Sequence, residues 1–312
     1  MASKNLRLIK TLWGIEEPIS ASLFLDIRNE GYHGVEVIRL AYLFDRDNLV
    51  NSLNAAGLSL VCQIHTSGGY LDNGEYIYCG SDSVEDHKQD FRTQLLEAKD
   101  LLSQVDMGGF INVHAGVDAW TLDESVDFLS FALDEIEELR KSEKDLIVTI
   151  ETHRQRLFGS PFQARELISK LHSIEKIQSL KLNADLSHWY CACERVFNKE
   201  KEPDTNWWPG LLKSVADRCH YIHARFGWAQ GPQMADPSAK ECEVDREVQL
   251  ETWKILITEQ LDRDDKRDVY CCPEYGPSPY LATLPHSQEP VASLTKAVKY
   301  TKNSLEKLYS EL

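Results

Sequence analysis

The stretch Leu146-Ile147-Val148-Thr149-Ile150-Glu151 is a short run of apolar and β-branched residues that ends on a carboxylate. Its length and composition are those of a buried β-strand. Runs of the same kind recur along the chain, and segments with apolar residues at three- and four-residue spacing separate them. Strands that alternate with helices predict parallel βα units.

Eight such runs can be recognised, and each is short enough to be one strand. The predicted strands are Leu6–Trp13, Gly34–Ile38, Leu58–His65, Gly109–His114, Leu146–Glu151, Leu180–Asp185, Tyr221–His223 with its flanks, and Val269–Glu274. The clearest helical patterns are Val84–Val105, Leu122–Arg140, Phe162–Leu171 opened by Pro161, Val244–Leu261, and a closing helix at Val291–Leu308.

The residues that end the strands favour a closed barrel over a doubly wound open sheet. Polar side chains stand at or near six strand ends: His65, His114, Glu151, Asp185, His223 and Glu274. A closed barrel brings these ends together on one face, whereas an open sheet spreads them along an edge. Since no linker divides the chain, we expect one (β/α)8 TIM barrel domain over residues 1–312. The segment Trp189–Gly210 is predicted as a long loop that forms a pocket wall, a lid or an interface.

Charge and composition narrow the classes of partner. The 312 residues carry a net charge of -16 with no basic patch, which disfavours nucleic acid and anionic membranes. No apolar run is long enough to span a bilayer. The N-terminus lacks a signal-peptide pattern, and the cysteines sit in or beside apolar segments, as reduced thiols do. These features predict a cytoplasmic protein.

Four of the strand-end residues form a set of candidate metal ligands. Glu151, Asp185, His223 and Glu274 follow successive strands, and three carboxylates brought together would repel one another. A divalent cation removes that cost, and this mixture of oxygen and nitrogen donors suits Mn, Mg, Co, Fe or Zn. The alternative is that each residue is hydrogen-bonded separately at its strand end.

Around these residues the chain resembles the xylose-isomerase-like barrels. This family includes sugar isomerases, tagatose and psicose 3-epimerases and, more distantly, endonuclease IV. The motifs that carry the resemblance are Glu151-Thr152-His153-Arg154, Asn183-Ala184-Asp185-Leu186-Ser187-His188-Trp189, Ile222-His223-Ala224-Arg225 and Pro273-Glu274-Tyr275-Gly276. The resemblance covers essentially the whole chain, and family members often assemble as homo-oligomers.

The resemblance implies one divalent metal ion, manganese first, held by Glu151, Asp185, His223 and Glu274. It implies isomerisation or epimerisation of a small sugar or keto-polyol, in which a proton leaves a carbon beside a carbonyl and an enediolate forms. Glu151 and Glu274 would also act as base and acid. His188 would contact a substrate oxygen, although it could instead steer Asp185.

Other polar and aromatic residues have two interpretations each. His65 and His114 are expected to bind substrate, but they also resemble histidines that hold additional zinc ions in endonuclease IV. Trp13 would form an apolar wall against a sugar face, or would fill the barrel mouth. Arg225 lies near a substrate-binding arginine of the family, at a different spacing.

Three further residues follow the same strands. His153 and Arg154 are expected in the pocket, with an outward salt bridge as the alternative. Glu36 lies within the second predicted strand and would either join the pocket or pair with a nearby lysine or arginine.

Two alternative functions remain on the same scaffold. An endonuclease-IV-like phosphodiesterase needs an Asp-x-His pair after the seventh strand, where this chain has Asp236-Pro237-Ser238. A metal-dependent lyase or dehydratase would use the same enediolate chemistry. Gly227 and Gly231 are too weak a signal for a phosphate loop, so a free sugar is favoured.

Overall fold

The computed structural model describes residues 4–39, 45–70, 76–198, 202 and 204–312. Eight parallel strands close into a (β/α)8 barrel, which confirms the predicted fold class. Their order around the barrel is β1-β10-β9-β8-β7-β6-β3-β2. Their bounds are Leu6–Thr11 (β1), Gly34–Ile38 (β2), Ser59–His65 (β3), Gly109–His114 (β6), Val148–Glu151 (β7), Leu182–Ala184 (β8), Cys219–His223 (β9) and Val269–Cys272 (β10). A short antiparallel pair, Gly69–Tyr70 (β4) and Tyr76–Ile77 (β5), follows β3.

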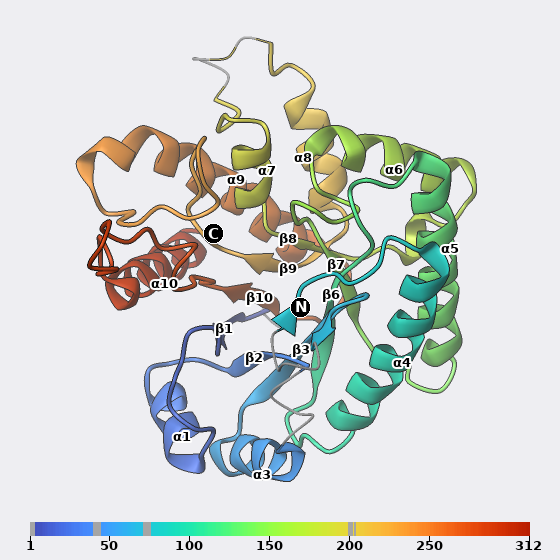
Figure 1. Cartoon of the computed structure of the whole chain (residues 1–312), viewed down its shortest axis with the longest axis horizontal. Helices are drawn as coiled ribbons and strands as arrows, with labels where there is room; N and C mark the ends of the chain where they lie inside the picture. Colours follow the sequence, from blue (N-terminus) through green and yellow to red (C-terminus); the bar gives the residue numbers. More distant parts are fainter. Residues whose placement is uncertain (1–3, 40–44, 71–75, 199–201, 203) are drawn as a thin grey trace. The chain divides into compact units, whose positions relative to one another are not determined.

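Helices alternate with these strands (Figure 1). They are Ala21–Asn29 (α1), Arg46–Ala56 (α3), Val84–Leu102 (α4), Leu122–Arg140 (α5), Pro161–Ser173 (α6), Ser187–Ala192 (α7), Trp208–Ala216 (α8), Glu243–Asp262 (α9) and Leu294–Ser310 (α10), with 3-10 turns at Ile177–Ser179 (η1) and Lys240–Cys242 (η2). Within the described residues, no helix combines the length and the hydrophobicity needed to cross a membrane.

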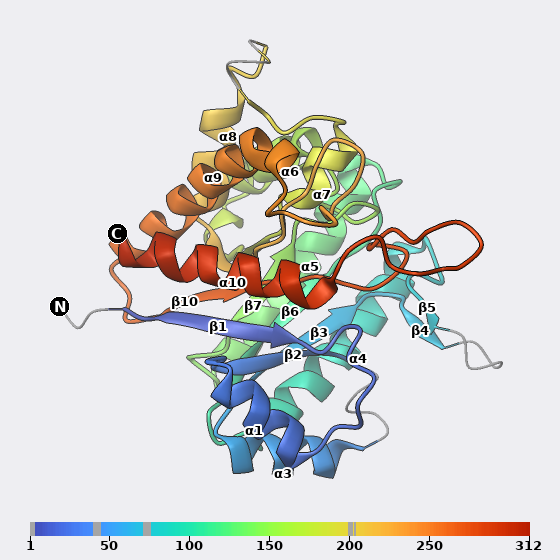
Figure 2. The ribbon, with the colours of Figure 1, turned by 90° about the vertical axis from the view of Figure 1, so that its left-hand side faces the viewer.

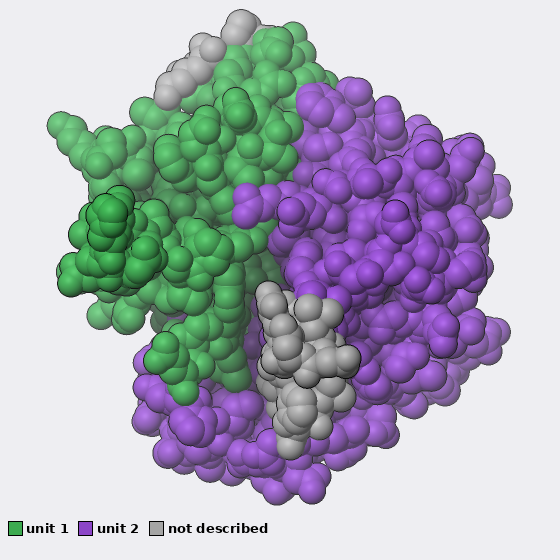
Figure 3. All heavy atoms as spheres, viewed as in Figure 1, with its two compact units in different colours: residues 1–16, 183–312 green, residues 17–182 purple. Residues whose placement is uncertain are grey.

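Chain contacts divide the barrel into two compact units (Figure 3). Unit 1 comprises residues 1–16 and 183–312, and unit 2 comprises residues 17–182. That the whole chain behaves as one domain stays a prediction.

In unit 2, local sequence signals fix the helix ends. Thr121 and Glu124 form a capping box at the start of α5, each side chain bonding the backbone of the other residue. Ser160 caps α6, and Pro161 occupies a first-turn position where a missing N–H costs nothing. Gly57 ends α3 in the left-handed region at φ 63°, which glycine tolerates without strain.

In unit 1, the closing helix α10 lies against β1 (Figure 2). Ser293 caps its first turn by accepting from Lys296 N. The Tyr309 hydroxyl near its end donates to the carbonyl of Lys4, just before β1. The last helix therefore ties the carboxyl-terminal segment of the chain to its first strand.

The segment expected to be one long loop is partly helical. Trp189 lies in α7 and Trp208 opens α8, and both side chains are buried. The two rings pack 6.2 Å apart, and Phe197 lies 4.6 Å from the Trp208 ring. The prediction of a loop was wrong at its two ends because these aromatic side chains bury one another and support short helices.

Candidate functional site

In unit 1, three of the predicted ligands lie at or just after the carboxyl ends of three strands. Asp185 directly follows β8, His223 is the last residue of β9, and Glu274 stands two residues after β10. The parallel register of β9 and β10 sets His223 beside Cys272. The backbone N–H of His223 donates to the Asn183 side chain at 3.1 Å, which holds β9 in place beside β8.

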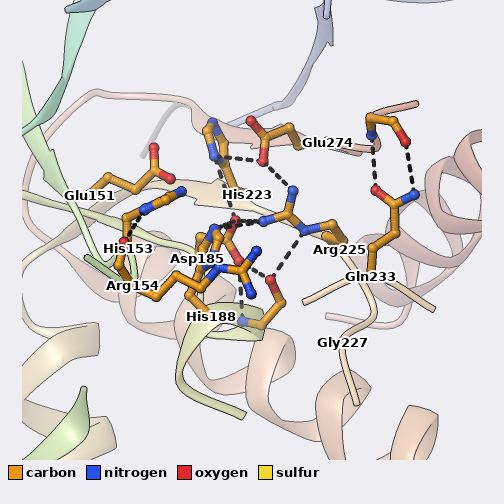
Figure 4. Close-up of polar contacts among 12 residues, drawn as sticks. Glu151, His153, Arg154, Asp185, His188, His223, Arg225, Gly227, Gln233 and Glu274 are labelled. Atoms are coloured by element: carbon orange, nitrogen blue, oxygen red, sulfur yellow. Dashed lines mark hydrogen bonds and ion pairs between the residues drawn. The ribbon is translucent and has the colours of Figure 1, made fainter. Parts of the chain in front are cut away.

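These three side chains form one buried cluster (Figure 4), called the Asp185 cluster below. One ligand atom of each residue lies within 4.8 Å of the others. His223 Nδ1 lies 3.3 Å from Glu274 Oε2 and 3.9 Å from Asp185 Oδ2. Two carboxylates and an imidazole, buried at this spacing, are a donor set suited to a divalent ion.

Arg225 bridges the two carboxylates of the cluster. Its Nη2 lies 2.5 Å from Asp185 Oδ2, and its Nη1 lies 2.9 Å from Glu274 Oε2. The residue is only 2% exposed, so both ion pairs are removed from water. The structure therefore places this predicted substrate-binding residue directly against two predicted metal ligands.

His188 and Ser187, in the first turn of α7, also contact Asp185. The Ser187 N–H donates to Asp185 Oδ1 at 3.1 Å, and its hydroxyl donates to the same oxygen. His188 Nε2 lies 3.5 Å from Asp185 Oδ2 and 2.8 Å from Arg225 Nη2. These contacts show that His188 touches Asp185, while a contact between His188 and a substrate stays a prediction.

An aromatic pair borders the Asp185 cluster within unit 1. The rings of Trp13 and Tyr280 meet edge to face at 4.7 Å. Tyr280 also lies 5.1 Å from the Arg225 guanidinium carbon and 6.3 Å from the His188 ring. Trp13 therefore belongs to a wall beside polar residues, and Tyr280 extends that wall although nothing in its sequence context singled it out.

In unit 2, a second polar group is built on β3, β6 and β7. The register pairs His65 with His114, and their ring centroids are 4.3 Å apart. Glu151, the last residue of β7, accepts from Asn112 Nδ2 at 2.6 Å and lies 3.0 Å from His114 Nε2. Asn112 stands two residues before His114, so strand alternation puts both on one face, a signal that could have identified it from the sequence.

Tyr78 links two histidines of this group, His114 and His153. His153 Nδ1 lies 2.5 Å from the Arg154 carbonyl, which only accepts, so this nitrogen carries the proton. The Tyr78 hydroxyl lies 3.1 Å from His153 Nδ1 and 2.6 Å from His114 Nδ1, so it contacts both histidines. On the other side of the His114 ring, Nε2 lies 3.0 Å from Glu151 Oε2. Tyr78 was not singled out from the sequence, whereas both histidines were.

Two histidines of this group, His65 and His153, have a lowered pKa. Burial keeps the pKa of His65 well below its ordinary value, and the nearby His114 adds to the effect. Burial and His114 likewise lower the pKa of His153. A lowered pKa favours the neutral form of His65 and His153, whose imidazoles each keep one lone pair. The side chains of His114, Glu151 and His153 bring ligand atoms within 4.8 Å of one another.

Two of the ambiguous residues face inward. His153 is buried, which supports the pocket interpretation over an outward salt bridge. Glu36 is also buried, and Asn112 Nδ2 lies 3.5 Å from its Oε1. Glu36 thus contacts an amide of the neighbouring polar group, which agrees with the prediction that it joins the pocket side of its strand.

The structure thus gathers the predicted site residues into two groups. Asp185, His188, His223, Arg225 and Glu274 form one group in unit 1, with Trp13 beside it. His65, His114 and Glu151 form the other group in unit 2. The assignment of Glu151 as a fourth ligand beside the Asp185 cluster stays a prediction.

Gly276 offers a way to test the aromatic wall. A Cβ at Gly276 would lie 2.2 Å from two atoms of the Trp13 ring, so Gly276→Ala must displace that ring. We expect KM for the substrate to rise roughly tenfold, about 1.4 kcal/mol, with kcat changed less. Gly210→Ala is the control, since no atom lies within 4 Å of its added Cβ. Equal KM values for both variants would exclude Trp13 from the substrate wall.

Several solved structures share the fold of this chain. No protein-family model matches the chain, and no curated protein matches it. Among solved structures, the IolI protein with a bound zinc atom superposes with a TM-score of 0.57 at 13% identity, covering 98% of both chains. An AP endonuclease of family 2 from Brucella melitensis gives 0.55 at 14% identity, covering 87% of this chain and 93% of its own. The 3-keto-D-glucoside 4-epimerase YcjR from E. coli gives 0.51 at 12% identity, covering 98% of this chain and 100% of its own.

At these identities the likeness establishes the fold. The chain has the (β/α)8 barrel fold of these solved structures, which agrees with the fold that the resemblance implied.

Proposed function

We propose that the protein is a divalent-metal-dependent isomerase or epimerase of a small sugar or keto-polyol. The observation that carries the proposal is the Asp185 cluster, in which Asp185, His223 and Glu274 present two carboxylates and an imidazole within 4.8 Å in a buried setting. This donor set fits a single divalent ion, with manganese preferred. When bound, the ion would stabilise negative charge that develops on the substrate oxygens.

The residues around the cluster supply the remaining functions. Glu274 and Glu151 are proposed as the acid and base that move a proton between neighbouring carbons. Glu151 is suited to this role because Asn112 and His114 hold one of its oxygens. The Trp13–Tyr280 pair would cover the apolar face of a sugar ring. His188 would orient a substrate hydroxyl, and His65 and His114 would bind further hydroxyls of the substrate.

Related structures support this class of reaction without specifying it. The neighbours include a 3-keto-D-glucoside 4-epimerase, whose name gives a keto sugar as its substrate. They also include an AP endonuclease, but this chain has Asp236-Pro237-Ser238 where the resemblance to endonuclease IV implies an Asp-x-His pair. A dehydratase on the same scaffold would begin with the same proton abstraction, so it is an outcome of the experiment below.

The test is turnover in D2O by chelator-treated protein supplied with Mn²⁺. The substrates are free and phosphorylated ketoses and inosose-type compounds. We expect one ketose to give a product of the same formula with solvent deuterium on carbon, because the abstracted proton exchanges before it returns. A product lighter by one water would assign a dehydratase. No conversion with Mn²⁺ across the panel would contradict the proposal.

A further inference from the structure

Arg225 places a fixed positive charge between the two carboxylates of the proposed metal site. Its guanidinium contacts Asp185 Oδ2 at 2.5 Å and Glu274 Oε2 at 2.9 Å. The same two oxygens are those that approach His223 Nδ1. A cation bound by the cluster would therefore use oxygens that already interact with an arginine.

The arginine is held in this position by further contacts. Its Nε donates to Ser187 Oγ at 3.2 Å, and Nη2 lies 2.8 Å from His188 Nε2. The Tyr280 ring lies 5.1 Å from the guanidinium carbon, within cation–π range. Arg225, Asp185 and Glu274 are all nearly fully buried, so water screens their charges poorly.

The positive charge of Arg225 has opposite effects on the metal-free cluster and on metal binding. Without a metal, it offsets one of the two negative charges of Asp185 and Glu274, which would otherwise repel each other inside the protein. With a divalent ion, the same guanidinium is a like charge close to the ion and weakens its binding. The Ser187 and Tyr280 contacts give the guanidinium partners that do not depend on the carboxylates.

We propose that Arg225 is an internal counter-ion that stabilises the metal-free cluster and sets a weaker affinity for the metal. This inference rests on the proposed metal site, and it assigns Arg225 a role toward the ligands in place of the predicted contact with substrate. It implies that metal binding and the Arg225 ion pairs each stabilise the fold. When the ion pairs are removed, the stability of the fold should depend more strongly on bound metal.

The test compares Arg225→Met with wild type in two measurements that need no substrate. The first is the Tm of chelator-treated protein, which we expect to fall by on the order of 10 °C in Arg225→Met. The second is the Kd for Mn²⁺, which we expect to become about tenfold tighter. Saturating Mn²⁺ should raise the Tm of Arg225→Met more than that of wild type.

Arg246→Met is the matched control. Arg246 also lies in unit 1, and its side chain donates to the carbonyls of Pro237 and Ala239 and approaches the Tyr300 ring. Its substitution should leave the Kd for Mn²⁺ unchanged. Arg225→Lys keeps the charge, so its Mn²⁺ affinity and metal-free Tm should stay closer to wild type than those of Arg225→Met.

The outcomes separate this inference from the proposed function. Wild type that binds no Mn²⁺ would overturn both. Wild type that binds Mn²⁺ while Arg225→Met shows the same Kd and metal-free Tm would overturn only the counter-ion role. If Arg225→Met folds only with Mn²⁺, the inference is supported. If it folds under neither condition, Arg225→Gln replaces it as the variant without the charge. A Tm or Kd of Arg225→Lys that departs from wild type as far as that of Arg225→Gln would then overturn the inference.

Discussion

Asp185→Asn is expected to lower turnover roughly 1,000-fold or more, because the substitution removes a charge that both a metal ion and Arg225 require. Asp185 is fully buried and accepts from the Ser187 N–H and hydroxyl through Oδ1 and from Arg225 through Oδ2. An asparagine keeps the shape but can present an N–H toward Arg225 or Ser187, both of which are donors.

The same substitution should also destabilise the protein by roughly 3 kcal/mol, since one partner of a buried ion pair is lost. Turnover and thermal unfolding would be measured together. Asp236→Asn is the control, because Asp236 accepts from the Ser238 N–H and hydroxyl in the same local turn yet is exposed. Unchanged turnover in Asp185→Asn would remove Asp185 from the site.

Arg156→Met is expected to destabilise unit 2 by roughly 3–5 kcal/mol. The Arg156 side chain is fully buried, and its guanidinium donates to the carbonyls of Thr66, Gly116 and Tyr78 at 3.0, 2.9 and 2.5 Å. It also stacks on the Tyr78 ring at 4.1 Å. Methionine fills similar volume but leaves these buried carbonyls without their donor.

The measurement is denaturant unfolding, compared with Arg92→Met. Arg92 pairs with Glu135 on the surface of unit 2, where water screens the charges, so its loss should cost far less stability than the loss of Arg156. Because Arg156 supports Tyr78, Arg156→Met should also disturb the contacts of Tyr78 with His114 and His153. A free energy of unfolding equal to that of Arg92→Met would show that Arg156 does not anchor this region.

The barrel could be predicted because each strand carries its own local signal. The bounds of β2, β6 and α5 agree with the predicted ranges, and β7 ends at Glu151 as expected. Strands buried on both sides appear in the sequence as apolar runs. The polar residues that end them then indicate which residues lie at the carboxyl-terminal face of the barrel. The ends of β8 were less predictable, since Leu180 and Lys181 precede a strand of only three residues.

The site could be predicted only in part, because some of its contacts depend on loops and on packing between strands. Asp185, His223 and Glu274 follow strands directly, so their convergence is encoded locally. Tyr280 and Tyr78 lie in loops, where sequence spacing does not determine which side chain reaches which neighbour. Arg225 could be predicted near the site, but its position between two carboxylates depends on the packing of three strands.

Mn²⁺ titration of chelator-treated protein by calorimetry tests the central claim most directly, with Asp185→Asn and Glu274→Gln measured beside wild type. We expect one ion bound per wild-type chain and at least about 100-fold weaker binding in both variants. Wild-type protein that binds no divalent ion, or variants that keep the wild-type affinity, would contradict it.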